Sequence, residues 1–464
     1  MTEATSWYSN LEDRASREAA IIVDAFDERG IDIGGEHDPA EHDRDLHPGG
    51  IAFMHDRDHI LIREQHLGGV GGVGGGRGHQ LLADASKRRG VLDLLQDGDH
   101  VQEVETVRVA GDVVLLCLKP RRHKHTRDHD YGDEAGGEHA DVLDLLDLID
   151  DELGEGIATP DHVLTAAQVT HPCSATEPEP PYPTAGPYPA ACRDGGARVR
   201  IFQADTGLVE GAAESFPWLA GIHGDPDPRH QQDGRIRPYG GHGTFVAGVM
   251  RCMAPHAQVH VANIFGTGGS ARESDVAMSL KAAFGFGAEI IHITASCLTR
   301  KNVPPLALEA WLEHLRQYKG AICVAEAGNN YTRRPAWPGA FPDVLAVGAL
   351  ATDWRHRADF SNYGGWVDVF APGENLINAM GSGTYTCQLA PHVGQERVFS
   401  GLAQWSGTSF SAPIVTGLIA ARMARRGESA REAAAALLAS ARTIPGVGRV
   451  LLPRSDDDDE DGGH

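Results

Sequence analysis

The sequence has few cysteines, no long apolar run and a minority of basic residues. Its 464 residues include only 7 cysteines, scattered and without a Cys-x-x-Cys pair. That pattern is typical of reduced thiols and unlike a disulfide framework. One disulfide between Cys173 and Cys192 is the alternative. No segment reaches the roughly 18 apolar residues of a membrane span, and residues 1–20 lack the basic and apolar parts of a signal peptide. We therefore expect a cytoplasmic protein with no membrane partner.

The charge balance excludes one further class of partner. Lys and Arg number 41 against 65 Asp and Glu, which leaves a formal net charge of −24. So acidic a surface repels phosphate backbones, and we expect no nucleic-acid partner. The hydrophobic content of 41% is ordinary for a soluble globular chain. The length is sufficient for two or three domains with at least one large core.

Residues 1–172 form the first compositional region, rich in charge, glycine and histidine. Strand-like patterns at 58–67 and 104–120 and helix-like patterns at 79–95 and 140–156 predict a smaller α+β unit. Its glycine-rich loop lacks the Gly-Lys-Ser/Thr ending of a phosphate-binding loop. Its histidine-rich stretch lacks closed ligand spacing. We predict no cofactor and no metal there.

The rest of the chain divides into three parts. Residues 173–192 are proline-rich and predict a linker, and residues 449–464 predict a disordered acidic tail. Between them, residues 193–448 alternate short apolar runs with helix-like stretches. This alternation predicts an α/β domain with a doubly wound, mostly parallel sheet and helices on both faces.

Four polar residues stand where the apolar runs of this domain end or where helices begin: Asp205, His242, Asn329 and Ser409. A parallel sheet gathers the carboxyl ends of its strands at one edge. Together the four supply a nucleophile, a base, a group that orients the base, and an oxyanion donor, which are the parts of acyl-transfer catalysis. Ser409 precedes an apolar helix-like run, and Pro413 is expected in the first turn of that helix.

These residues lie in motifs that resemble the subtilisin-like serine proteases (subtilases). The matching motifs are Asp-Thr-Gly at 205–207, His-Gly-Thr-Phe-Val-Ala-Gly at 242–248, Ala-Gly-Asn at 327–329 and Gly-Thr-Ser-Phe-Ser-Ala-Pro at 407–413. The resemblance covers about residues 196–446. It implies a subtilisin-like fold and a serine endopeptidase (EC 3.4.21.-) acting on polypeptides.

The resemblance also implies a role for each residue. Ser409 would be the nucleophile and His242 the general base, while Asp205 would orient the imidazole. The Asn329 amide and the Ser409 backbone N–H would form the oxyanion hole.

Two segments would hold the substrate in an extended form: Gly269, Ser270 and Ala271 on one side, and Thr294, Ala295 and Ser296 on the other. In relatives the second segment usually contains two glycines, so the resemblance argues against a large open specificity pocket here.

Glu326 stands where relatives usually carry a small residue on the pocket wall. Three orientations are open to it. It could select Lys or Arg before the cleaved bond, pair with Arg272, or point into solvent.

Relatives often insert a calcium-binding loop after the helix of the catalytic histidine. Residues 242–259 pass without that insertion, so we predict no metal. Relatives also commonly carry an N-terminal propeptide with a small α+β fold, and residues 50–120 could form one.

The leading expectation is an endopeptidase controlled by its N-terminal region, through self-cleavage or a regulatory protein. The alternatives are a protease dedicated to one peptide precursor and a catalytically silent module that binds peptides.

Overall fold

The computed structural model describes residues 17–36, 51–68, 90–97, 101–120, 142–166, 177–189, 198–229, 234–266 and 268–453. Several sequence predictions fall outside these residues: the Cys173–Cys192 alternative, the histidine-rich stretch at 121–130, most of the glycine-rich loop, and residues 454–464 of the acidic tail. Within the described residues, five cysteines are reduced thiols: Cys117, Cys252, Cys297, Cys323 and Cys387.

Within the described residues, the centre of the molecule is a nine-stranded sheet. Its spatial order is β17 (Arg442–Ile444), β18 (Gly448–Val450), β14 (Val369–Pro372), β13 (Val344–Leu350), β12 (Ile322–Glu326), β11 (Ile290–Ile293), β6 (Arg200–Asp205), β9 (Gln258–Asn263) and β7 (His223–Gly224). Neighbouring strands are parallel except β17 and β18. The strands β12, β11 and β6 are adjacent, so their carboxyl ends lie at one edge of the sheet.

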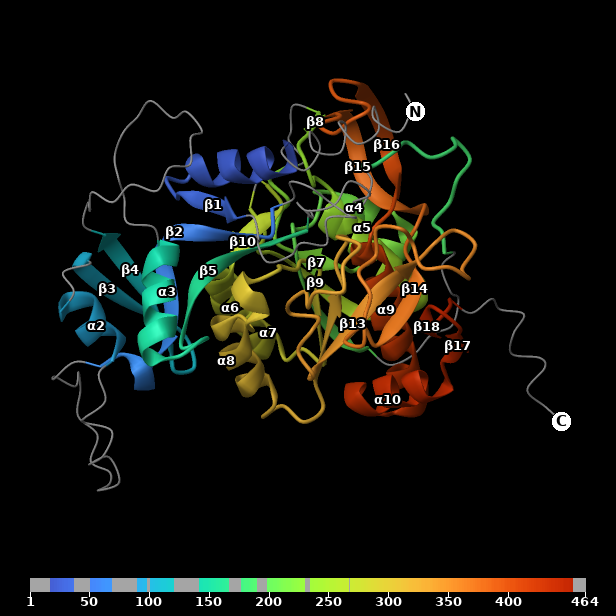
Figure 1. Ribbon diagram of the computed structural model, residues 1–464. Helices are drawn as coiled ribbons and strands as arrows, with labels where there is room; N and C mark the ends of the chain where they lie inside the picture. Colours follow the sequence, from blue (N-terminus) through green and yellow to red (C-terminus); the bar gives the residue numbers. More distant parts are fainter. Residues whose placement is uncertain are drawn as a thin grey trace.

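Helices cover both faces of this sheet (Figure 1). On one face α5 (His242–Met253), α9 (Thr408–Arg426) and α10 (Ala430–Ser440) pack into one apolar core. On the other face α6 (Glu273–Ser279), α7 (Lys281–Phe286) and α8 (Leu306–Leu315) pack into a second core. Central strands between two helical layers are buried on both faces, which explains their continuous apolar runs. The predicted doubly wound α/β class is confirmed.

A long hairpin closes one side of the sheet. Strands β15 (Leu376–Thr386) and β16 (Glu396–Trp405) are antiparallel, and the short β8 (Arg235–Ile236) pairs with β15. The remaining short elements are α4 (Ala212–Ser215), η1 (Glu64–His66), η3 (Pro217–Leu219) and η4 (Arg300–Asn302). Among the described helices, none combines the length and the apolar character needed to cross a bilayer.

Part of the proline-rich stretch packs on this hairpin. Backbone bridges join Glu179 to Gln404 and Tyr188 to Ile377. The Glu177 carboxylate accepts hydrogen bonds from the Tyr385 hydroxyl at 2.6 Å and from a backbone N–H of the loop that follows β15. This segment therefore has fixed contacts with the hairpin.

The N-terminal region contains its own sheet. Its elements are a helix at 17–27, β1 (Ile33–Glu36), β2 (Phe53–Arg63), α2 (Val91–Asp97), β3 (Val101–Ala110), β4 (Val113–Pro120), α3 (Val142–Leu153) and β5 (Ala158–Thr165). The sheet order is β5-β2-β4-β3, with β1 beside β2. Of the helix predicted at 79–95, the described part begins at residue 91.

The two regions share a core. One face of the N-terminal sheet packs with α2 and α3. The other contributes Leu61, Val113, Leu115 and Leu164 to the core that contains α6 and α8, and Figure 1 shows the N-terminal strands beside these helices. In addition, β5 pairs antiparallel with β10 (Ser270–Arg272) of the larger region. The N-terminal sheet thus continues into a segment that the sequence assigns to the substrate cleft.

Candidate active site

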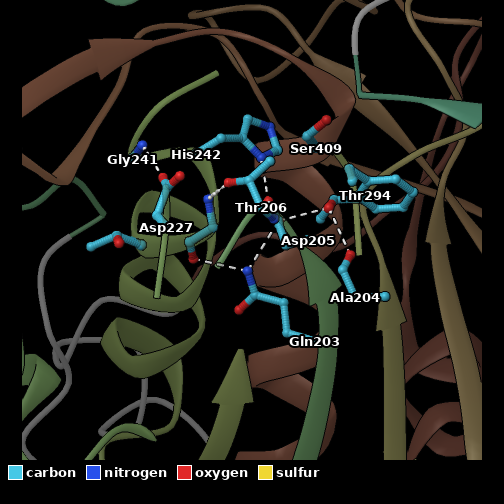
Figure 2. A network of polar contacts seen from close by, with 12 residues as sticks. Gln203, Ala204, Asp205, Thr206, Asp227, Gly241, His242, Thr294 and Ser409 are labelled. Atoms are coloured by element: carbon cyan, nitrogen blue, oxygen red, sulfur yellow. Dashed lines mark hydrogen bonds and ion pairs between the residues drawn. The ribbon is translucent and has the colours of Figure 1, made fainter. Parts of the chain in front are cut away.

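Asp205 and His242 form the centre of the site (Figure 2). Asp205 ends β6 and His242 begins α5, and the His242 Nδ1 lies 2.8 Å from an Asp205 carboxylate oxygen. Two glycines make this approach possible. Gly241 has a φ of +81°, a conformation that side chains disfavour. A Cβ on Gly243 would lie 2.4 Å from the carbonyl oxygen of Gly207, so the helix packs against the turn after Asp205.

The Asp205 carboxylate accepts hydrogen bonds on both oxygens. Besides His242, its donors are the Thr206 backbone N–H at 2.7 Å, the Thr294 hydroxyl at 2.6 Å and the Gln203 amide at 3.0 Å. Burial alone would raise the pKa of Asp205, but the charge of His242 and these donors outweigh it and hold the pKa below its usual value. Asp205 is therefore an ionised partner that fixes the orientation of the imidazole.

Gln203 supports this site through hydrogen bonds and was missed by the sequence analysis. Its amide donates to Asp205 and to the Gly243 carbonyl oxygen at 2.9 Å, and so joins β6 to α5. The available signal was a polar residue on a strand that is otherwise buried and apolar.

A buried Arg–Asp pair supports the same site and was also missed. The Asp227 carboxylate accepts the Gly241 backbone N–H at 2.7 Å, at the start of the histidine helix. The Arg229 guanidinium, 1% exposed, pairs with Asp227 and donates to the carbonyl oxygens of Thr206 and Phe265. It connects the turn after Asp205 with the loop that leads to the cleft segment at 269–271.

Ser409 is the second residue of α9 and is buried. Its side chain lies next to the His242 imidazole in Figure 2. The ring of the following residue, Phe410, is centred 5.3 Å from the His242 ring. The Ser409 hydroxyl donates to the Glu326 carboxylate in this state. Pro413 lies in the second turn of α9, one turn later than expected, because the helix begins at Thr408.

Glu326 lies between Ser296 and the turn at Thr408–Ser409. It is fully buried at the end of β12. One carboxylate oxygen accepts from the Ser296 hydroxyl at 3.2 Å, and the other accepts from the Ser409 hydroxyl. The Thr408 hydroxyl oxygen lies 3.2 Å from this second oxygen and shares its one proton between Glu326 and Asn329. Burial raises the pKa of Glu326 to about 7, and the hydroxyl donors and His242 offset only part of that rise.

Two of the orientations considered for Glu326 are wrong in this structure. The side chain is not in solvent, since it is fully buried. It is not paired with Arg272, whose guanidinium donates to Asp56 at 2.9 Å and to Asp275 at 3.0 Å.

Asn329 follows β12 and faces the turn at Thr408–Ser409, the candidate nucleophile turn. Its carbonyl oxygen accepts the Thr408 backbone N–H and the Thr408 hydroxyl, both at 2.8 Å. Its amide nitrogen is buried and, within the part of the chain that the structure describes, has no hydrogen-bond partner. Buried donors are rarely left unpaired, so this amide is available to a group that arrives beside Ser409.

The two predicted substrate segments lie on either side of the chain's own β5. The Thr165 N–H donates to the Ser296 carbonyl oxygen at 3.0 Å, and the Ser296 N–H donates back at 3.2 Å. On the other side, Ser270 pairs with Thr165 and Ala271 with Leu164.

The structure also shows the contacts of the end of β5 and of the other residues predicted to line the cleft. The Ala166 N–H donates to the Gly269 carbonyl oxygen at 2.9 Å. Ala295 is buried in the core between the sheet and α6 to α8. The side chain of Thr294 faces Asp205 rather than the cleft. Among the described residues, no group of three or more His, Cys, Asp or Glu side chains could hold a metal ion.

Comparison with known proteins places the chain in a family. The subtilase family (peptidase S8) matches residues 213–458, a range that begins after Asp205 and includes His242, Asn329 and Ser409. The thermophilic serine proteinase of Bacillus sp. (strain AK1) is 32% identical over 45% of this chain and 48% of its own length. Thermitase of Thermoactinomyces vulgaris is 28% identical over 54% of this chain and 84% of its own length.

Among solved structures, the patellamide maturation protease PatA is 29% identical, covers 55% of this chain and 93% of its own, and has a TM-score of 0.43. By contrast, the match spans only about half the length of the thermophilic serine proteinase. The family match extends over more than half of the chain and contains three of the four site residues. The chain belongs to the subtilase family of subtilisin-like serine proteases.

Proposed function

We propose that this protein is a serine endopeptidase whose N-terminal region occupies the substrate cleft until it is removed. The observation that carries the proposal is the convergence of Asp205, His242, Asn329 and Ser409 from four separate segments. Each contributes a different part of acyl-transfer catalysis.

The chemistry follows from the contacts. Because Asp205 holds the Nδ1 side of the His242 ring, Nε2 is free to take the Ser409 proton as the hydroxyl attacks the peptide carbonyl. Ser409 must first turn from Glu326 toward His242, a change that substrate binding would favour. His242 then donates the proton to the leaving amine. A water molecule hydrolyses the acyl-enzyme by the same route.

Two N–H donors would stabilise the oxyanion. The Asn329 amide nitrogen is buried beside the nucleophile turn without a partner in the described structure. The Ser409 backbone N–H lies in the first turn of α9, where helix N–H groups have no intrahelical acceptor. Donors fixed before the substrate arrives need no reorganisation in the transition state.

Control by the N-terminal region is supported by β5. Its end lies between the two cleft segments and exchanges backbone hydrogen bonds with Ser296. A polypeptide substrate would need the same hydrogen-bonding positions. The chain therefore blocks its own cleft. Cutting it beyond Ala166 would allow the N-terminal region to leave.

The two alternative functions, a silent peptide-binding module and a protease dedicated to one precursor, differ in what they require of the site. A silent peptide-binding module would need only the cleft, and the intact Asp205–His242 pair beside Ser409 argues against it. A protease dedicated to one precursor would use the same chemistry with a narrow specificity.

A fluorophosphonate probe tests the proposal directly. We expect one covalent adduct on the folded full chain, located at Ser409 by peptide mass spectrometry. Absence of the adduct in protein with a cooperative thermal transition would support the silent binding module instead.

Release of β5 should speed this labelling. Leu164 is fully buried where β5 meets β10 and belongs to the core that contains α6. Leu164→Asp would bury an unpaired carboxylate there, at a cost of several kcal/mol. The strand should then leave the cleft, and the labelling rate of freshly purified full chain should rise at least about tenfold, since 1.4 kcal/mol is one factor of ten.

Val107→Asp is the matched control, because Val107 is 52% exposed on the same N-terminal sheet. It should label at the wild-type rate. Equal labelling rates for Leu164→Asp and wild type would show that β5 does not limit access to Ser409.

A further inference from the structure

We propose that the cleft accepts only a small side chain, such as that of alanine or serine, in the residue before the cleaved bond, because Glu326 fills the space that a larger side chain would need. The inference rests on the proposed endopeptidase function and names the substrate class of the same site.

The position of the cleaved bond follows from two hydroxyl contacts. Ser296 and Ser409 both hydrogen-bond to the single carboxylate of Glu326. With hydrogen bonds of about 3 Å, the two hydroxyls lie within roughly 8 Å of each other. Thr165 pairs with Ser296. An extended chain advances about 3.3 Å per residue, so one or two residues beyond Thr165 reach Ser409.

The chain's own sequence supplies the residue at that point. Thr165 is followed by Ala166, Ala167 and Gln168. Whether the bond opposite Ser409 follows Ala166 or Ala167, an alanine precedes it. In the sequence, the residue before either bond therefore carries only a methyl side chain.

Glu326 explains why a methyl group fits. Its fully buried side chain lies between Ser296 of the cleft segment and the Thr408–Ser409 turn. Hydroxyl donors engage both carboxylate oxygens, so the side chain is held from two sides. A leucine, phenylalanine or lysine entering here would have to displace it and break these hydrogen bonds. Volume rather than charge is the basis of the selection.

If Glu326 instead selected substrates by charge, the cleft would prefer Lys or Arg before the cleaved bond. Such a carboxylate must be ionised and must have an oxygen that can accept a hydrogen bond from the cationic side chain. Here both oxygens already accept hydroxyl protons, from Ser296 and Ser409. Burial also raises the pKa of Glu326 to about 7, so that at neutral pH only about half of the carboxyl groups are ionised.

The test uses two series of peptides copied from the chain, Val-Leu-Thr-Ala-Xaa-Gln-Val and Val-Leu-Thr-Xaa-Ala-Gln-Val, in which Xaa is Ala, Ser, Leu, Phe or Lys. Mass spectrometry of the cleaved Ala peptide shows which series varies the residue before the cleaved bond. Because β5 would occupy the cleft of the full chain, we would compare kcat/KM among the five peptides of that series for full-length proteins with wild-type Glu326, Glu326→Gln or Glu326→Ala. Each would carry Leu164→Asp, the substitution expected to release β5 from the cleft. Ratios of kcat/KM between peptides, taken within one protein, cancel any effect that a Glu326 substitution has on the reactivity of Ser409 itself. Glutamine keeps the volume of the side chain and removes its charge, whereas alanine removes both.

We expect the protein with wild-type Glu326 to cleave the Ala and Ser peptides with a kcat/KM about 100-fold higher than that for the Leu, Phe and Lys peptides. A closed pocket that excludes larger side chains gives a discrimination of this size. Glu326→Gln should keep this ranking. Glu326→Ala should improve the Leu and Phe peptides at least about tenfold relative to the Ala peptide.

Other outcomes overturn the inference. A wild type that prefers Lys, with the preference lost in Glu326→Gln, would make Glu326 a charge-reading residue. Equal rates for all five peptides would show that no small pocket exists. If Glu326→Ala does not fold, the wild type and Glu326→Gln still separate volume from charge. No cleavage of any peptide together with no fluorophosphonate adduct would refute the endopeptidase function itself, and this inference with it.

Discussion

Ser409→Ala is expected to lower kcat for peptide hydrolysis by about 10⁶-fold, the effect that loss of the nucleophile has in subtilisin. The hydroxyl lies beside His242 at the start of α9, and alanine leaves His242 no nucleophile to activate. Glu326 would keep the hydrogen bond from Ser296 and the nearby Thr408 hydroxyl, so we expect the fold to persist. Steady-state rates and thermal unfolding of the same preparations measure both effects.

The same variant reports on self-cleavage. If the wild type removes its own N-terminal region, intact mass should show a shortened wild-type chain and a full-length Ser409→Ala chain after identical expression. The new N-terminus should begin at Ala167 or Gln168, the residues that follow the docked end of β5. Both proteins remaining full length would mean that a partner, not self-cleavage, opens the cleft.

Ser411→Ala provides the matched control for Ser409→Ala. Ser411 lies on the same helix, is equally buried, and donates its hydroxyl to the Thr408 carbonyl oxygen at 2.9 Å. It has no place in the proposed chemistry. Its kcat should stay within a few-fold of wild type, and a loss as large as that of Ser409→Ala would point to damage of the helix start rather than loss of a nucleophile.

Asn329→Ala is expected to lower kcat by about 10²–10³-fold with little change in KM, as removal of one oxyanion donor does in subtilisin. The Asn329 amide nitrogen is buried beside the nucleophile turn and has no partner in the described structure. It therefore contributes mainly when negative charge develops on the substrate oxygen. That contribution belongs to the transition state, and KM should be nearly unaffected.

Asn329→Asp separates this role from a structural one. Aspartate keeps an oxygen that can accept the Thr408 N–H and hydroxyl, which Asn329 binds at 2.8 Å, but it has no N–H to donate. We expect a loss of kcat at least as large as for alanine, with a melting temperature closer to wild type. An Asn329→Asp enzyme with more than about a tenth of wild-type kcat would show that the amide donor is dispensable.

Much of the catalytic region could be predicted from local sequence. Strands buried on both faces are continuously apolar, and the doubly wound class was confirmed on that signal. The four site residues follow such runs or begin helices, so their approximate place at one sheet edge was predictable. Their catalytic roles remain predictions, supported by the 2.8 Å contact between His242 and Asp205 and the unpaired amide of Asn329.

Supporting residues were harder to predict, because their roles depend on partners distant in sequence. Gln203 binds a carbonyl oxygen 40 residues away, and Arg229 binds carbonyl oxygens on two different loops. The only local signal for Gln203 is its place on an otherwise apolar buried strand, and nothing in the local sequence of Arg229 distinguishes it from an ordinary polar residue. The orientation of Glu326 was open for the same reason, since its donors come from the cleft segment and the nucleophile turn.

The sequence by itself determined the family, the α/β class and the positions of the four site residues, because glycine turns, helix starts and buried strands impose short-range patterns. Only the tertiary structure decided that β5 lies between the segments 269–271 and 294–296, that β10 extends the N-terminal sheet, and that Glu326 accepts a hydrogen bond from Ser409. Pairing between strands uses backbone N–H and C=O groups that every residue other than proline carries. Which strand finds which edge is therefore decided by the packing of whole layers, here the shared core of the N-terminal sheet with α6 and α8.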